Sequence, residues 1–191
     1  VFLQPSPSAS LGEGFGADVC SVSDVDNDNI PDIAVYAKRS DELDPSIRVL
    51  SGADRSIVLS IDLGPVGGVV EAGDPVVIAS GNGSLLLVGQ PAYGTGGVDA
   101  SPGRVQVFDL RTGELVHLHE GTGTMGLGAG LAAVGDVDGD LVGDYALGAP
   151  GGGIAASGAV YVHSGADGSL IRLQLNPLFT GAMGAGLARV G

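Results

Sequence analysis

The chain has 191 residues, and its 35 Gly and 10 Pro together make up nearly a quarter of it. This content excludes a protein built of long helices, while a hydrophobic fraction of 44% excludes a disordered acidic tail. The net charge of -14 excludes a surface for nucleic acid or for an anionic membrane, and the single cysteine, Cys20, excludes an internal disulfide and a cysteine-based zinc site.

The sequence repeats with a period of about 56 residues. The segment Gly128–Gly135 resembles Gly184–Gly191, which lies one period further on. It also resembles Gly16–Ser23, which lies two periods before Gly128–Gly135. In the same way, Ser51-Gly-Ala-Asp54 recurs two periods later as Ser164-Gly-Ala-Asp167. Self-similarity at a fixed period indicates a repeat protein, in which each period is one structural unit.

In chain order, this period divides the sequence into five parts. Residues 1–10 are predicted to be the outer strand of a preceding unit, and residues 11–64 a complete unit with an acidic loop. Residues 65–121 form a unit whose loop lacks acids, and residues 122–180 a second unit with an acidic loop. Residues 181–191 are predicted to be the first strand of a following unit.

Each unit contains four short strand patterns separated by clusters of Gly, Asp, Pro or Ser. In the third unit the predicted strands are Ala129–Gly135, Tyr145–Ala149, Ala159–His163 and Leu170–Leu175. The pattern predicts an all-β fold, a β-propeller of four-stranded antiparallel blades, with about three complete blades and partial blades at both ends. A β-sandwich is the alternative, but a sandwich does not require the repeat.

Two units carry an acidic loop between their first and second strands, with Asp at positions 1, 3, 5 and 9. Carboxylates at this spacing, with a backbone carbonyl at position 7, supply the six to eight oxygens that Ca²⁺ takes. We therefore predict two calcium sites. The predicted ligands are Asp24, Asp26, Asp28, Ile30 and Asp32 in the first loop, and Asp136, Asp138, Asp140, Val142 and Asp144 in the second.

Other interpretations of these loops have less support. A solvated acidic turn is the simplest, but it does not explain the same spacing at equivalent places in two units. An EF-hand is excluded because position 12, Val35 or Leu147, lies in a predicted strand and is not Glu. Neither loop contains Cys or His, which argues against zinc and copper.

The middle unit has Ala79–Leu85 in place of the acidic loop, without a single acid. We predict a tight turn around Asn82-Gly83. Asn82-Gly-Ser84 is also a glycosylation sequon, although turn chemistry explains the same residues.

The sequence resembles the FG-GAP repeat family, known from the propeller of integrin α subunits and from secreted bacterial proteins. Phe15-Gly16 matches the FG of the family name and Gly148-Ala-Pro150 matches the GAP, whereas Tyr36-Ala-Lys38 departs from it. The resemblance implies a seven-bladed calcium-binding propeller, and it implies the same aspartates as ligands. Since the chain holds fewer than four units, we expect a segment of a longer protein, or copies that associate through open blade edges.

These features predict a non-enzymatic, extracellular calcium-binding module, bacterial in origin, for adhesion or protein-protein interaction. The alternative is a structural subunit or spacer of an extracellular assembly, stiffened by calcium. No membrane insertion is expected, because no apolar run approaches about 20 residues. A glycan partner has little support, because the chain has no Trp and only 4% aromatic residues.

Two further patterns carry no predicted function. Gly121–Gly126 matches the Gly-x-Gly-x-x-Gly of dinucleotide sites, but it leads into a Gly/Ala strand where such a site needs a helix. His117 and His119 lie on the same side of one predicted strand, and we interpret them as exposed polar residues of an outer strand rather than as metal ligands.

Overall fold

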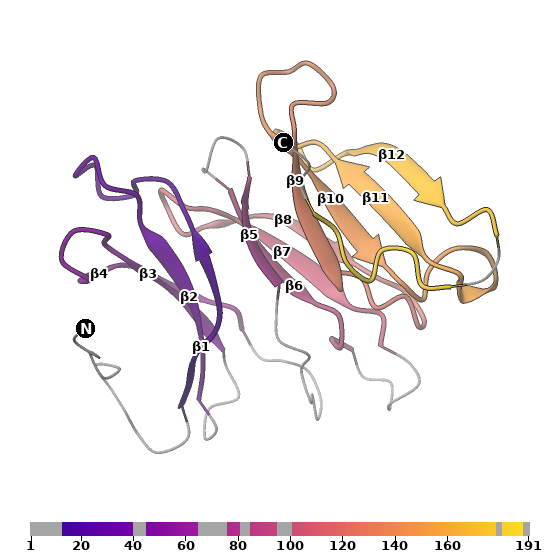
Figure 1. Cartoon of the computed structure of the whole chain (residues 1–191), viewed down its shortest axis with the longest axis horizontal. Helices are drawn as coiled ribbons and strands as arrows, with labels where there is room; N and C mark the ends of the chain where they lie inside the picture. The colour runs from indigo at the N-terminus through magenta and orange to yellow at the C-terminus, as the bar shows by residue number, and fades with distance from the viewer. Residues whose placement is uncertain are drawn as a thin grey trace.

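The computed structural model describes residues 13–39, 45–64, 76–80, 85–94, 101–178 and 181–188. The strand expected in residues 1–10 and the turn at Asn82-Gly83 lie outside these ranges, as does the sequon at Asn82. The described residues form an all-β structure of three four-stranded antiparallel sheets, which lie side by side in chain order (Figure 1). One short 3-10 turn, η1 (Ile154–Ala156), is the helical structure found in these ranges.

Each sheet is a meander whose strands follow one another in sequence order. The first sheet contains β1 (Glu13–Ser21), β2 (Ile33–Arg39), β3 (Ser46–Leu50) and β4 (Ile57–Asp62). The second contains β5 (Val76–Ser80), β6 (Leu85–Gln90), β7 (Arg104–Asp109) and β8 (Leu115–Glu120). The third contains β9 (Gly130–Gly135), β10 (Asp144–Ala149), β11 (Ala159–His163) and β12 (Leu170–Leu175).

The four strands predicted for the third unit are confirmed. The predicted and observed bounds of β11 and β12 coincide, and β9 and β10 each begin within one residue of the predicted start. The hairpin between β11 and β12 closes through a hydrogen bond from the Gly168 amide to the Ser164 carbonyl, 3.0 Å long. Gly168 has φ 74, a conformation that glycine adopts without a steric penalty.

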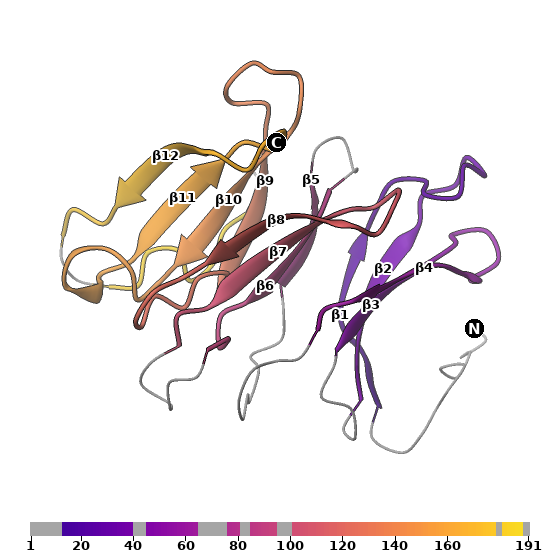
Figure 2. The ribbon, with the colours of Figure 1, turned by 180° about the vertical axis from the view of Figure 1, so that it is seen from behind.

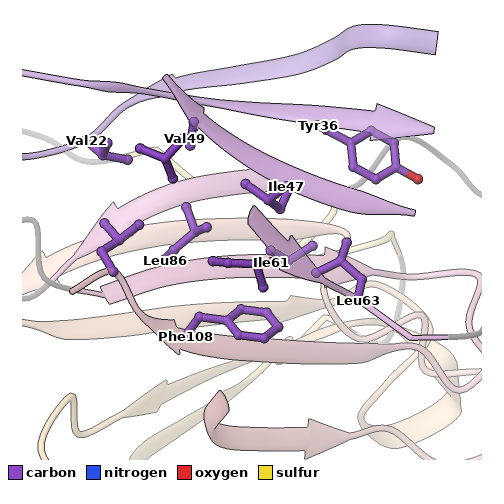
Figure 3. Packing of buried hydrophobic residues seen from close by; sticks show 11 residues of the cluster. Val22, Tyr36, Ile47, Val49, Ile61, Leu63, Leu86 and Phe108 are labelled. Carbon is purple, nitrogen blue, oxygen red and sulfur yellow. The ribbon is translucent and has the colours of Figure 1, made fainter. Parts of the chain in front are cut away.

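The middle strands of the second sheet, β6 and β7, are buried because this sheet lies between the other two (Figure 2). On one face, Leu86 and Val88 of β6 pack against Ile47 and Val49 of the first sheet (Figure 3). On the other face, Leu87 belongs to the cluster shared with the third sheet. All of β6 is buried, as expected for a middle strand with apolar residues on both faces.

The third sheet contributes its own side chains to the second of these clusters. Tyr145 and Leu147 of β10 are fully buried there, together with Leu131 of β9. The lone cysteine, Cys20 of β1, is partly buried and packs against the cluster between the first and second sheets. Burial of apolar surface between neighbouring sheets therefore holds the three sheets together.

The inner strands of neighbouring sheets lie close together, with β1 beside β5 and β5 beside β9. On the neighbouring strands β6 and β10, backbone meets backbone without intervening side chains. A Cβ on Gly89 would lie 2.3 Å from the carbonyl oxygen of Gly128, and a Cβ on Gly148 would lie 2.0 Å from that of Gly184. Only glycine allows such an approach, which explains the glycines of these segments.

The last described segment, residues 181–188, was expected to start the first strand of a following unit. It forms a single parallel bridge between Gly158 and Met183 and no strand. An equivalent bridge joins Gly103 to Leu127, just before β9. A first strand needs a second strand to pair with, and none of the described residues provides one after Met183.

Candidate metal centres

Two acidic clusters lie at equivalent places, in the loop between the first and second strands of the first and third sheets. In the first, one carboxylate oxygen from each of Asp24, Asp26 and Asp32 lies within 4.8 Å of the others. Asp136, Asp138 and Asp144 form the second cluster in the same way. The structure therefore brings positions 1, 3 and 9 of each predicted site together, and either cluster could hold a metal ion.

The aspartate at position 9 is the buried member of each cluster. Asp144 is fully buried at the start of β10, and its carboxylate accepts hydrogen bonds from two backbone amides. Oδ2 accepts from Val137 at 2.7 Å, and Oδ1 accepts from Gly165, in the β11–β12 turn, at 3.0 Å. One side chain thus ties the acidic loop to the neighbouring hairpin.

The first loop repeats this arrangement. Asp32 is also fully buried, and its Oδ2 accepts from the amide of Val25 at 2.8 Å. Its Oδ1 accepts from the amide of Gly52, in the β3–β4 turn, at 3.0 Å. Two loops that lie two periods apart in the sequence therefore share one hydrogen-bonding scheme, which the repeat does not by itself guarantee.

The aspartate at position 1 shapes each loop by accepting bonds from amides further along it. Asp24 accepts from the amides of Asp28 at 3.0 Å and Asn29 at 2.8 Å. The chain makes this tight turn with positive φ values at Asn27 and Asn29, a conformation that Asn tolerates better than most residues.

In the second loop the carboxylate of Asp136 accepts from three amides. These belong to Gly139 at 2.6 Å, Asp140 at 3.1 Å and Leu141 at 3.0 Å. Gly139 and Leu141 take the positive φ values here, and Leu141 is 85% exposed. Leucine has a conformational energy penalty at φ 72, because its Cβ crowds the backbone, and an exposed side chain offers little packing to offset it.

The aspartates at position 5, Asp28 and Asp140, lie outside the two clusters. Asp140 Oδ1 accepts from the amide of Val142 at 2.7 Å, and its Oδ2 lies 3.4 Å from the Ser164 hydroxyl. Asp28 makes the same contacts with Ile30 and Ser51, at 2.7 and 3.4 Å. Metal ligation by these side chains, and by the carbonyls of Ile30 and Val142, stays a prediction.

The carboxylates at position 3 are harder to ionise than free aspartate. Loss of solvation, followed by repulsion from the neighbouring carboxylates, raises the pKa of Asp26 and of Asp138. Both side chains are exposed. The clusters therefore offer oxygen ligands at a strongly negative point on the surface, a donor set that fits a hard cation such as Ca²⁺.

Sequence reasoning missed the residues that support each cluster from the neighbouring hairpin. A Cβ on Gly52 would lie 2.1 Å from the Pro31 carbonyl oxygen, and a Cβ on Gly165 would lie 2.1 Å from that of Gly143. Only glycine brings these amides to the position 9 carboxylate. The repeated Ser-Gly-Ala-Asp sequence was the available signal, because it places the same glycine in the hairpin of both units.

The second sheet has only residues 81–84 between β5 and β6, too few for such a loop. At the hairpin position that holds Ser51 and Ser164 in the other sheets, the second sheet has Asp109. Its carboxylate accepts from the amides of Arg111 at 2.7 Å and Thr112 at 3.2 Å.

The interpretation of His117 and His119 as exposed residues is wrong. Both are half-buried on β8, where they face the third sheet. His119 Nε2 lies 2.9 Å from the hydroxyl of Tyr145 on β10. The two histidines do lie on one side of a strand, as predicted, but this side is covered by the neighbouring sheet.

Comparison with protein-family models and with curated proteins finds no match for this chain. No helix in the described part of the chain has the length and apolar character needed to cross a bilayer.

Proposed function

We propose that the chain is a calcium-binding segment of a β-propeller of the FG-GAP type, in which each four-stranded sheet is one blade. The observation that carries the proposal is the arrangement that the two acidic loops share, each with three clustered carboxylates and a buried aspartate bonded to the next hairpin. The close approach of β1, β5 and β9 supports the arrangement of blades around an axis.

Bound calcium supplies charge neutralisation, and the residues of the chain hold the loop in the shape that receives it. Asp136 organises the loop backbone, while Asp144 fixes the loop to the hairpin at Gly165. Both contacts are formed by the chain itself, so the site is largely preorganised. Calcium at millimolar concentration outside cells suits sites of this kind, and we place the protein there.

Within this setting, the module serves adhesion or protein-protein interaction and is not an enzyme. The second candidate is a structural subunit or spacer, in which the bond between Asp144 and Gly165 stiffens the blade by coupling the metal loop to the hairpin of the same sheet. Sedimentation velocity with calcium and with EDTA separates the two. Calcium-dependent self-association favours the structural subunit, and a monomer in both conditions favours the interaction module.

The calcium claim is tested by titrating the full chain with Ca²⁺ in a calorimeter and by following thermal unfolding. We expect two sites and a higher melting temperature with calcium, since a ligand at 100 times its dissociation constant adds about 2.7 kcal/mol. Asp136→Ala should remove one site and leave the other. Heat and melting curves unaffected by calcium, in a folded protein, would refute the proposal.

A further inference from the structure

All three histidines of the chain gather in one place, at the contact between the second and third sheets. His117 and His119 extend from β8, and His163 extends from β11. The rings of His119 and His163 lie with their centroids 4.1 Å apart. None of these side chains takes part in the acidic clusters, so their placement calls for a separate explanation.

Each histidine is held by a fixed partner in the third sheet or its hairpin. His163 donates from Nδ1 to the carbonyl of Gly168 at 2.9 Å, because a carbonyl can only accept. His117 Nε2 lies 3.4 Å from the carbonyl of Gly165, and its ring packs so closely on Gly168 that a Cβ there would lie 2.8 Å from Nδ1. His119 shares its hydrogen bond with Tyr145.

The titratable and charged groups around His119 and His163 offer little compensation for a positive charge. Tyr145 of β10 and Tyr161 of β11 contribute aromatic rings, and Tyr145 keeps its proton because burial raises its pKa. Glu120 of β8 lines a cavity beside these rings. Asp167, in the β11–β12 turn, lies near His117. No described carboxylate forms an ion pair with either ring.

Water and protons nevertheless have access to these rings. A cavity of about 360 Å³ is lined by both histidines, together with Glu120, Met125 and Tyr161. Burial, and then repulsion from the other two histidines, lowers the pKa of His119 to about 4. Burial likewise lowers the pKa of His163. Both rings are therefore neutral at pH 7 and resist protonation while the contact is closed.

We propose that the contact between the second and third sheets is an acid-labile joint, which opens when His119 and His163 are protonated and leaves the contact between the first and second sheets closed. The joint is built from side chains that are separate from the metal clusters. Two cations with their ring centres 4.1 Å apart in a partly dry contact repel each other, and separation of the sheets hydrates both.

The direction of the pH effect follows from the pKa values. The native pKa of His119 lies below its ordinary value of 6.5, so the opened contact binds the proton more tightly than the closed one. The stabilisation is complete above pH 6.5 and is lost as the pH falls toward about 4. The contact between the first and second sheets has no histidine, and its buried arginine, Arg104, stays protonated throughout this range.

Hydrogen exchange of the full chain, saturated with calcium, measures each contact separately at pH 7.5 and pH 5. After correction for the intrinsic effect of pH, we expect amides of β8, β10 and β11 to lose protection by about tenfold at pH 5, a value reduced for the partial exposure of His119. Amides of β2 and β3 should keep theirs. The first sheet carries the same kind of acidic loop, so it controls for acid effects on the loops.

Two variants sharpen the test. The double variant His119→Gln and His163→Gln should keep its protection at pH 5, and Val116→Gln, an exposed change on the same strand, should behave as the wild type. Equal loss at both contacts, or the same loss in the double variant, overturns the proposal. If the double variant does not fold, NMR titration of the wild type decides, because a His119 ring that titrates at 6.5 or above also overturns it.

Discussion

The carboxylate of Asp144 accepts a hydrogen bond from the amide of Gly165, 21 residues further along the chain. The same carboxylate is the buried member of a cluster with Asp136 and Asp138. One side chain therefore serves two roles, because it contributes an oxygen to the proposed metal cluster and accepts a hydrogen bond from the hairpin. Loss of this residue should affect the fold even when no metal is present.

The first prediction concerns Asp144→Asn, measured by chemical unfolding in EDTA. The amide side chain has one acceptor oxygen in place of two, so a buried backbone amide loses its partner, and we expect a loss of about 1–3 kcal/mol. Asp138→Asn is the matched control. It removes an exposed carboxylate whose pKa is raised by its neighbours, so the variant should be as stable as the wild type or more so in EDTA. Equal losses in both variants would contradict the assigned role.

A second prediction concerns Gly165→Ala. The added methyl group would lie 2.1 Å from the carbonyl oxygen of Gly143, so the hairpin and the loop must move apart. We expect a loss of about 1–3 kcal/mol in the free energy of unfolding, together with weaker calcium binding at this loop. Gly186→Ala is the control, because nothing lies within 4 Å of its Cβ position. If Gly165→Ala were as stable as Gly186→Ala, the close contact between Gly165 and the Gly143 carbonyl would not constrain the fold.

Leu141 provides the third prediction. It holds a positive φ of 72° at an exposed loop tip, where the equivalent residue of the first loop is Asn29. Leu141→Asn should stabilise the protein by about 1 kcal/mol, because Asn occupies this conformation at a lower cost. Val137→Asn, an exposed change in the same loop at ordinary φ, should give no such gain. Unfolding curves in EDTA compare the two, and equal effects would count against backbone strain as the cause.

The fourth prediction concerns the reactivity of Cys20. Burial, followed by repulsion from Asp18, raises the pKa of the thiol from 9.0 to about 12. A raised pKa lowers the thiolate fraction at pH 8, and the thiolate is the reactive form. We expect reaction with a disulfide reagent at least a hundredfold slower in the native protein than in urea. Similar rates in both conditions would show that the thiol is accessible and unperturbed.

Much of the fold was predictable because the strands depend on local patterns. The bounds of β11, Ala159–His163, follow from an apolar run that ends before a Gly-Ala-Asp turn, and such turns determine where a strand stops. The loop spacing predicted the clustering of Asp136, Asp138 and Asp144, but it also placed Asp140 in the site, and Asp140 lies outside the cluster.

Contacts between sheets were not predictable in this way. The alternation of β8 places His117 and His119 on one face, but only the neighbouring sheet decides whether that face meets water. The bond from Gly165 to Asp144 lies within the third sheet, but the acidic loop sequence does not reveal it either, because it joins residues from two separate strand connections. Sequence patterns describe one strand or loop at a time, whereas these features belong to pairs of elements.

Gly89 of β6 and Gly148 of β10 determine how closely the following segment of the chain can approach each sheet. Gly89 meets the backbone of Gly128, and Gly148 meets that of Gly184, with no side chain between them. Substitutions elsewhere in the strands can change how firmly neighbouring sheets adhere, but the distance of closest approach is fixed by peptide groups, which mutation does not alter. The closest approach at these two places is therefore encoded by residues that have no side chain.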